Sequence, residues 1–388
     1  MTAALPAHSR VGASGMERWA NCPGSVRLCE PLENKAGEFA AEGSVAHELA
    51  ELALTSRKWK HLLGTTRRHD GFGIVVTQEM IDAVLQYKVI VDDIGPRTRH
   101  VEHKFHITRL HAALHGTADC VLWDPAAQHL DVIDYKHGAG MAVEVEDNMQ
   151  LRYYAVGAML TLGYNAKTIG VHIVQPRCPH PDGPHRTATY TALELLDFAA
   201  DMVAAVKATE QPDAPLRPGT WCRKSFCPAQ AICPALHMLA QDVAKAEFRE
   251  DLSFDPEKLA DTLDWLPVLE GWIKAVREFA YAQAEAGTPP PRYKLVEKMA
   301  REKWSPITTP ALVASRFNLR VEDIVSAPEL LSPAQVRKLV PGKNDRERGA
   351  ALAEFTVKES SGHTLVHEAD KRSDVKESAR KEFSRADD

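Results

Sequence analysis

The chain has 388 residues, of which 44% are hydrophobic and 26% are charged, and its formal net charge is −6. This length allows a sizeable buried core in two or three domains, and the composition is that of an ordinary globular protein. No apolar run is long enough to span a membrane, and the first residues, MTAALPAHSRVGASG, lack the basic and apolar regions of a secretory signal. We therefore expect a cytoplasmic protein without a membrane partner. The negative charge excludes a uniformly basic surface, but it leaves room for a local basic groove that binds nucleic acid.

The N-terminal part is predicted to be irregular over residues 1–35, apart from a short helix near residues 16–20. Apolar residues at helical spacing then predict a helix over residues 36–54 and a second helix over residues 77–94.

The middle of the chain changes its period. Three short segments bounded by turn residues, 100–108, 115–124 and 129–138, predict a β-meander with a hairpin turn at PAAQ. A helix over 148–162, a strand over 168–177 and a helix over 193–210 follow. This order predicts an α/β (α+β) domain, a mixed central β-sheet flanked by helices, that ends near residue 240.

The C-terminal third is predicted to be mostly helical. Residues 256–287 have strong helical character and end at Gly287, and residues 308–340 suggest two or three short helices. The charged last part, residues 346–388, is expected to be disordered. The predicted organisation is thus a domain over 1–240, a mainly helical accessory region over 241–345, and a tail over 346–388.

The most informative stretch is GTADCVLWDPAAQHLDVIDYKHG, which holds Asp119, Asp134 and Lys136. Strand side chains alternate, so Asp134 and Lys136 share one face of the sheet while Tyr135 lies on the other. A hairpin would bring Asp119 alongside Asp134. Two carboxylates and an ammonium suit a divalent metal and an activated water, although an isolated Asp-x-Lys is usually a solvated surface pair.

Two predicted helices add polar residues to this pattern. Gln150 and Tyr154 lie four residues apart on the helix after Lys136, and His47 and Glu51 lie four apart on the first long helix. Each residue alone is typical of a surface or core position. Their order and spacing together favour a site.

With these residues the sequence resembles the PD-(D/E)XK nuclease superfamily. It is most similar to the RecB-type branch, which includes the CRISPR-adaptation nucleases and the AddB nuclease domain. The resemblance covers residues 15–240, implies a restriction-endonuclease-like core, and is accompanied by similarity of the whole chain to uncharacterised phage-associated proteins. The matching motifs are GSVAHELAE, GTAD, VIDYK and QLRYY.

The resemblance implies roles for these residues. The metal ligands for Mg²⁺ or Mn²⁺ would be His47, Asp119, Asp134 and the backbone carbonyl of Tyr135. Lys136 would orient or deprotonate the attacking water, and Gln150 and Tyr154 would hold the DNA backbone or support the site. Glu51 would act behind the metal ligands or as a further ligand, and a solvated helix face is an equal alternative for it.

Cysteines form a second pattern, because Cys222, Cys227 and Cys233 lie within twelve residues. In a reducing compartment such a cluster favours zinc or an iron–sulfur cluster over disulfides. Either metal needs a fourth ligand, for which Cys22 and Cys29 are candidates. Two more, Cys120 and Cys178, are expected to be small buried apolar residues.

Relatives in the nuclease branch carry a [4Fe–4S] cluster with one cysteine before the nuclease motifs and three after them. The resemblance therefore implies Cys22, Cys222, Cys227 and Cys233 as its ligands, with Zn²⁺ as the alternative. The chain has C-x4-C-x5-C where relatives have C-x2-C-x5-C, so the position of Cys222 departs from the family. We expect a structural clasp rather than a redox centre.

The sequence thus predicts a metal-dependent DNA nuclease, an exonuclease acting on single-stranded DNA or duplex ends in phage or bacterial recombination, repair or replication. The resemblance places it in the cytoplasm of a bacterial host cell, as a homo-oligomer or with a phage recombination partner. Two alternatives are a non-catalytic DNA-binding or scaffold protein that kept the clasp, and a zinc-dependent regulator. A histidine run from His100 to His115 fits no compact ligand set.

Overall fold

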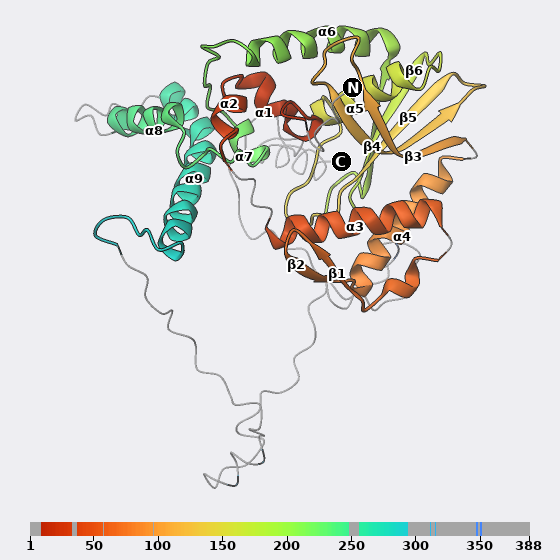
Figure 1. Ribbon diagram of the computed structural model, residues 1–388, viewed down its shortest axis with the longest axis horizontal. Coiled ribbons are helices and arrows are strands. Elements are labelled where there is room, and N and C mark those ends of the chain that lie inside the picture. The colour runs from red at the N-terminus through yellow and green to blue at the C-terminus, as the bar shows by residue number, and fades with distance from the viewer. Residues whose placement is uncertain are drawn as a thin grey trace, which may run out of the picture. The chain divides into compact units, whose positions relative to one another are not determined.

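The computed structural model describes residues 9–293, except 33–36, 57, 96 and 248–255, together with the single residues 311, 315, 347 and 350. The chain divides into two compact units, residues 1–296 and 297–388. All helices and strands described below belong to the first unit (Figure 1).

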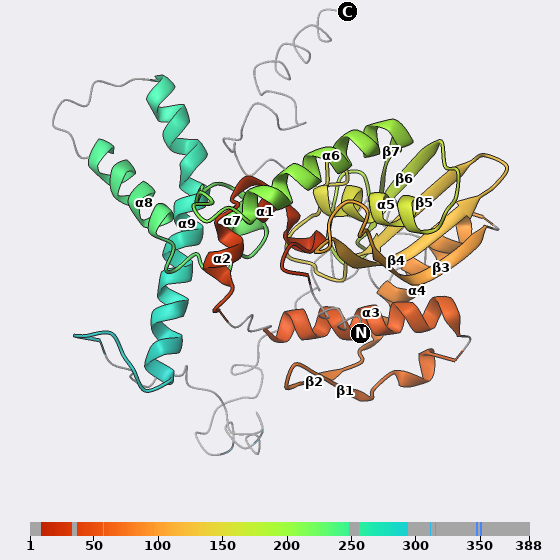
Figure 2. The ribbon, with the colours of Figure 1, turned by 45° about the horizontal axis from the view of Figure 1, so that its top comes forward.

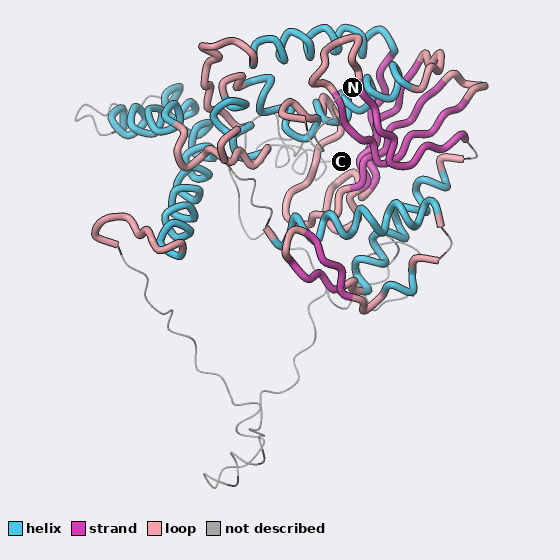
Figure 3. The backbone as a smooth tube through the Cα atoms, viewed as in Figure 1, coloured by secondary structure: helices cyan, strands magenta, loops and turns pink. Residues whose placement is uncertain are grey.

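A five-stranded mixed sheet forms the centre of this unit (Figure 3). Its strands, in spatial order, are β3 (Thr98–His106), β4 (His115–Asp124), β5 (His129–Tyr135), β6 (Thr168–Val174) and β7 (His185–Thr191). Neighbouring strands are antiparallel except β5 and β6, which run parallel. A parallel pair needs a crossover connection, and α5 (Met149–Thr161) provides it. The predicted mixed sheet flanked by helices is confirmed.

Helices cover both faces of the sheet (Figures 1 and 2). On one face lie α3 (Glu38–Thr55) and α4 (Gln78–Asp93), whose apolar residues share a core with Ile133 and Tyr135 of β5. On the other face lie α1 (Met16–Asn21), α5 and α6 (Ala192–Thr209), which share a core with Val132 and Val171. The two cores separate because alternate strand residues point to opposite faces.

The long helices begin where the sequence supplies a capping side chain. Asn148 accepts a hydrogen bond from the backbone N–H of Leu151 at the start of α5, and Thr77 does the same for Met80 in α4. Thr191 forms a reciprocal capping box with Glu194 at the start of α6. These caps agree with the predicted starts within one or two residues.

Several elements were not predicted. A hairpin of β1 (Thr66–His69) and β2 (Phe72–Val75) lies between α3 and α4, and β7 forms an edge of the main sheet. The strands β1 and β2 have four residues each, and β7 is largely polar with alternating exposure, so none of the three has the long apolar run of a buried strand. The prediction of irregular structure over residues 1–35 is wrong beyond the short helix, because η1 (Ala13–Gly15) and α2 (Ser25–Cys29) also form.

After the sheet, the chain continues through the helices α7 (Trp221–Lys224), α8 (Pro234–Glu247) and α9 (Pro256–Glu285). A short 3-10 helix, η2 (Lys60–Leu62), precedes β1. The predicted helix over 256–287 is confirmed, and Gly287 ends it with a φ of 87° that suits glycine. The boundary predicted near residue 240 falls inside α8. The predicted helices over 308–340 and the predicted tail over 346–388 lie outside the described residues, apart from single positions.

No helix in the described ranges has the length and apolar character needed to cross a membrane.

Candidate active site

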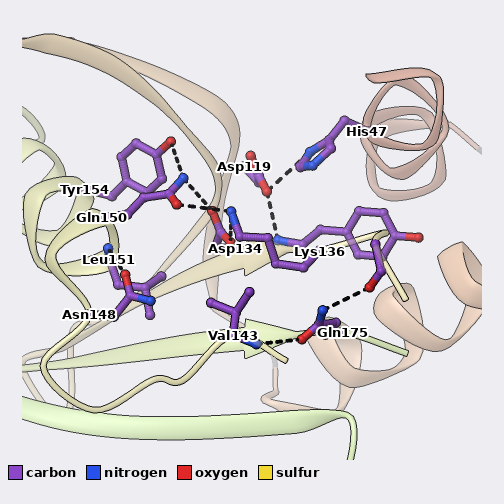
Figure 4. Close-up of polar contacts among 12 residues, drawn as sticks. His47, Asp119, Asp134, Lys136, Val143, Asn148, Gln150, Leu151, Tyr154 and Gln175 are labelled. Atoms are coloured by element: carbon purple, nitrogen blue, oxygen red, sulfur yellow. Dashed lines mark hydrogen bonds and ion pairs between the residues drawn. The ribbon is translucent and has the colours of Figure 1, made fainter. Parts of the chain in front are cut away.

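Asp119 and Asp134 lie side by side on neighbouring strands (Figure 4). In the β4–β5 ladder Cys120 pairs with Ile133, and continuing this register by one step sets Asp119 opposite Asp134. The backbone N–H of Tyr135 donates to Asp119 Oδ2 at 2.8 Å. The hairpin that the sequence predicted therefore brings the two carboxylates together.

The alternation of β5 also agrees with the prediction. Tyr135 is packed in the core under α3 and α4, and its hydroxyl lies 2.8 Å from His137 Nδ1. Asp134 is 2% exposed, and its side chain lies with that of Lys136 on the α5 side of the sheet (Figure 4). The role of the Tyr135 carbonyl as a metal ligand stays a prediction.

Lys136 and Gln150 connect the carboxylates to α5. Lys136 Nζ lies 2.9 Å from Asp134 Oδ2 and donates to Gln150 Oε1 at 3.2 Å. The amide nitrogen of Gln150 donates to the Tyr154 hydroxyl at 3.0 Å and reaches Asp134 Oδ1 at 3.5 Å. Gln150 therefore holds the lysine, one carboxylate and Tyr154 in a single network.

His47 reaches the same place from α3, on the other side of the site. Its Nδ1 lies 3.4 Å from Asp119 Oδ2, and its ring packs edge-on against Tyr135 with 5.4 Å between ring centroids. Glu51 lies one helical turn further along α3 and is exposed. The structure thus brings together His47, Asp119, Asp134, Lys136, Gln150 and Tyr154, and leaves Glu51 at the solvent-exposed margin.

Burial and neighbouring charges shift the pKa values of this cluster. Burial raises the pKa of the Asp134 carboxyl, and Asp119 adds to this while Lys136 opposes it. Burial alone would lower the pKa of the Lys136 ammonium, but the adjacent Asp134 reverses this and raises it. Burial, followed by the charge of Asp134, also raises the pKa of Tyr154. The site therefore places several acidic groups beside one lysine.

One acidic residue of the site was not predicted to act there. Glu102 on β3 lies between the ladder pairs Val101–Cys120 and His103–Ala118, which sets it opposite Asp119. Its φ is 50°, and burial, with the charges of Asp119 and Glu51, raises its pKa to about 7. The sequence marks Glu102 only as part of a strand, because its position opposite Asp119 depends on the register of the β3–β4 pair.

The residues present fit Mg²⁺ or Mn²⁺ by donor type. Carboxylate oxygens with one imidazole are suitable ligands for these ions, and apart from its 2.9 Å contact with Lys136 the buried Asp134 Oδ2 has no polar partner in the described part of the chain. As they stand, no three His, Cys, Asp or Glu side chains in the described ranges are arranged closely enough to hold a metal ion.

Cys22, Cys222, Cys227 and Cys233 line one small cavity together with Arg18. The backbone N–H of Arg217 donates to Cys22 Sγ at 3.2 Å, which ties the N-terminal cysteine to the segment before α7. The four cysteines that the resemblance implied therefore line one cavity, although no three of them are arranged closely enough to hold a metal ion as they stand. Thiolate sulfurs suit both zinc and an iron–sulfur cluster.

A fifth cysteine, Cys29, lies against this group. Its Sγ is 3.8 Å from Cys227 Sγ. The hydrogen bond with Cys227 lowers the pKa of the Cys29 thiol to about 7, against the effect of burial, and the same contact raises the pKa of Cys227. The sequence placed Cys29 among the candidates for the fourth ligand, but it did not indicate that Cys22 and Cys29 both reach the cluster.

The structure agrees with the expectation that Cys120 and Cys178 are buried apolar residues and that the histidine run forms no compact ligand set. Cys120 and Cys178 are buried, and burial raises the pKa of Cys120 to about 12. The histidines of the run contact separate partners: His100 contacts Tyr164, His103 contacts Thr161, His106 contacts the Ala112 carbonyl, and His111 contacts Glu210.

Comparisons with known proteins give a family but no activity. A family model described as "Protein of unknown function (DUF2800)" matches residues 8–373. Among solved structures, one titled "Crystal structure of SSO0001" is similar with 14% sequence identity and a TM-score of 0.28, over 60% of this chain and 90% of that chain. At this TM-score the likeness supports no conclusion about fold or function.

Proposed function

The chain belongs to the DUF2800 family, whose function is unknown, and we propose that it is a Mg²⁺- or Mn²⁺-dependent deoxyribonuclease. The observation that carries this proposal is the convergence of Asp119, Asp134 and Lys136 with His47 and Gln150, which come from separate helices. A purely structural ion pair needs neither the second carboxylate nor the imidazole beside it.

The chain's own residues then have definable tasks. His47, Asp119 and Asp134 would hold the cation, which when bound would supply a Lewis acid that neutralises phosphoryl oxygens and activates water. The Lys136 ammonium has three N–H groups, of which Asp134 and Gln150 engage two in the described part of the chain. A third can point at the attacking water or at a phosphoryl oxygen and offset the charge that develops in the transition state.

Gln150 and Tyr154 position this machinery. Gln150 fixes the Lys136 side chain, and the Tyr154 hydroxyl accepts the amide hydrogen of Gln150. Both would hold the DNA backbone or support the site, and Glu51, at the exposed edge, would act behind the metal ligands or as a further ligand.

The substrate we propose is DNA, as single strands or duplex ends, cut exonucleolytically in bacterial or phage recombination, repair or replication. The proposed place of action is the bacterial cytoplasm, with a homo-oligomer or a phage recombination protein as a partner. These finer points follow from the family resemblance of the motifs.

We propose a structural role for the cavity that the four cysteines line. Cys22 with Cys222, Cys227 and Cys233 would hold a [4Fe–4S] cluster, or Zn²⁺ as the alternative. Either ties the N-terminal segment to the segment after α6 and stabilises the fold by closing a long loop in the unfolded chain.

The test is degradation of 5′- and 3′-labelled single- and double-stranded DNA with Mg²⁺ or Mn²⁺. We expect wild type to cut, and Asp119→Ala and Lys136→Met to lose activity by about 100-fold or more while remaining folded. Lys104→Met, which removes an exposed lysine of β3, is the matched control and should stay active. If well-folded, metal-loaded wild type degrades none of these substrates, the scaffold alternative replaces the nuclease.

A further inference from the structure

The five clustered cysteines are one more than a four-ligand metal site uses. Cys29 ends α2, and Cys227 lies in the turn after α7, 198 residues later. Their sulfurs are 3.8 Å apart, and both residues are half-buried, so small solutes can reach them. Among the cysteines that the structure describes, this is the one thiol pair within hydrogen-bonding distance.

We propose that Cys29 and Cys227 form a disulfide when the four-thiol cavity holds no metal. The inference rests on the thiol geometry, and it goes beyond the proposed nuclease activity because it assigns a redox modification site. The chain then has two mutually exclusive clasps that share Cys227, one made by a metal and the other by a disulfide.

The exclusion follows from the chemistry of sulfur. A metal ligand must be a thiolate, and a sulfur in a disulfide has no thiolate to offer. Closing the bond requires the two sulfurs to approach from 3.8 Å to about 2 Å. Side-chain rotation at the end of α2 and in the turn at Cys227 would have to supply this movement.

The oxidant that we infer is a small disulfide such as oxidised glutathione. The Cys29 thiolate attacks one sulfur of the small disulfide and releases one glutathione thiolate. The Cys227 thiolate then attacks the mixed disulfide at Cys29 and releases the second glutathione. Two protein thiols are oxidised, one small disulfide is reduced to two thiols, and the protons pass to solvent.

The same two chain regions are joined in either state. A metal would link Cys22 to the segment of Cys222–Cys233, and the disulfide would link Cys29, seven residues further on, to Cys227. Oxidation would therefore block metal uptake while the N-terminal segment stays fastened. Reduction would return Cys227 to the four-thiol cavity.

The experiment uses the full chain, stripped of metal by a chelator under reducing conditions and then incubated with oxidised glutathione. Peptide mapping without reductant should show a Cys29–Cys227 cross-link as the dominant species, with a loss of two free thiols. The oxidised protein should take up neither iron nor zinc until dithiothreitol is added. Cys29→Ser should lose the cross-link and keep metal uptake, whereas Cys178→Ser, a control outside the cluster, should retain both.

Three results would overturn the proposal. The first is a dominant cross-link among Cys22, Cys222 and Cys233, or glutathione adducts alone. The second is metal uptake by fully oxidised protein. The third is loss of metal uptake in reduced Cys29→Ser, which would make Cys29 a ligand. None of these measurements contains DNA, so they are independent of whether the nuclease proposal holds.

Discussion

Lys136, the residue after β5, donates through its ammonium to the side-chain oxygen of Gln150 in the first turn of α5, 3.2 Å away. The Asn148 cap sets where α5 begins and thereby where Gln150 points. Gln150 also contacts Asp134 and Tyr154. A single amide thus determines the orientation of the groups that would meet the scissile phosphate.

Gln150→Leu tests this positioning role. Leucine keeps the approximate volume but removes both hydrogen-bonding groups, so Lys136 loses one of its two partners. We expect kcat on labelled DNA to fall about 10- to 100-fold, because a misplaced catalytic group costs rate more than binding. The melting temperature should change little.

The matched control is Gln78→Leu, which changes an exposed glutamine in the first turn of α4. Its activity should equal that of wild type. Equal activity of Gln150→Leu and wild type would show that the Lys136–Gln150 contact has no part in catalysis.

Removal of one of the four cysteines proposed as metal ligands should lower the stability of the fold. For Cys22→Ser we expect loss of bound iron or zinc and a melting temperature lower by several degrees, since a clasp over a long loop contributes about 2–5 kcal/mol. Metal content by elemental analysis and thermal unfolding measure the two effects. Cys178→Ser should keep its metal, and a brown protein with thiolate-to-iron absorption distinguishes a cluster from zinc. Unchanged metal content in Cys22→Ser would exclude Cys22 as the fourth ligand.

Acid should destabilise the protein through His172 of β6, which contacts Asp131 of β5 away from the candidate active site. Asp131 is 3% exposed, and His172 Nε2 lies 2.8 Å from its Oδ1 while Arg97 pairs with its other oxygen. Burial and the charge of Arg97 lower the pKa of His172 from its ordinary value to about 4. His172 is therefore neutral in the folded chain and takes up a proton near its ordinary pKa in the unfolded chain.

The sign of the effect follows from this difference. Its contribution to stability is fully present above pH ~6.5 and is lost as the pH falls toward about 4. From about pH 7.5 to about pH 5 we expect the free energy of unfolding to fall by about 2 kcal/mol through this group, measured by urea titration. His172→Gln should have a shallower dependence, with His137 and His185, whose burial also lowers their pKa values to about 4, supplying the rest. An identical pH slope in the variant would show that His172 does not titrate in this way.

Two helical glycines should respond to alanine with opposite signs. At Gly157 in α5 an added Cβ would lie 2.5 Å from the Phe105 ring of β3, so Gly157→Ala should destabilise by about 1–3 kcal/mol. At Gly43 in α3 no atom lies within 4 Å of the added carbon, so Gly43→Ala should stabilise by up to about 1 kcal/mol. Denaturant midpoints measure both, and a destabilised Gly43→Ala would contradict the packing described here.

The closeness of α5 to β3 at Gly157 also shows why the sequence could predict elements more easily than contacts. Apolar residues at helical spacing predicted the long helices, and short segments bounded by turn residues predicted strands β3 to β6, because both signals are local in the sequence. The hairpin of β1 and β2 and the edge strand β7 were not predicted, because β1 and β7 are largely polar and the apolar strand β2 is only four residues long.

The contacts of the candidate site also divide into those that the sequence could predict and those that it could not. The alternation of β5 and the tight turn after Asp124 were enough to pair Asp119 with Asp134 and to place Lys136 beside them, since a hairpin ladder is local and its period is two. Only the tertiary structure decided that Glu102 lies opposite Asp119 and that Cys29 contacts Cys227. The same holds for the contacts of Asp131 with Arg97 and His172. No tight turn sets the register of β3 against β4, and the other contacts join segments that meet only when whole helices and strands pack, so local periodicity determines none of them.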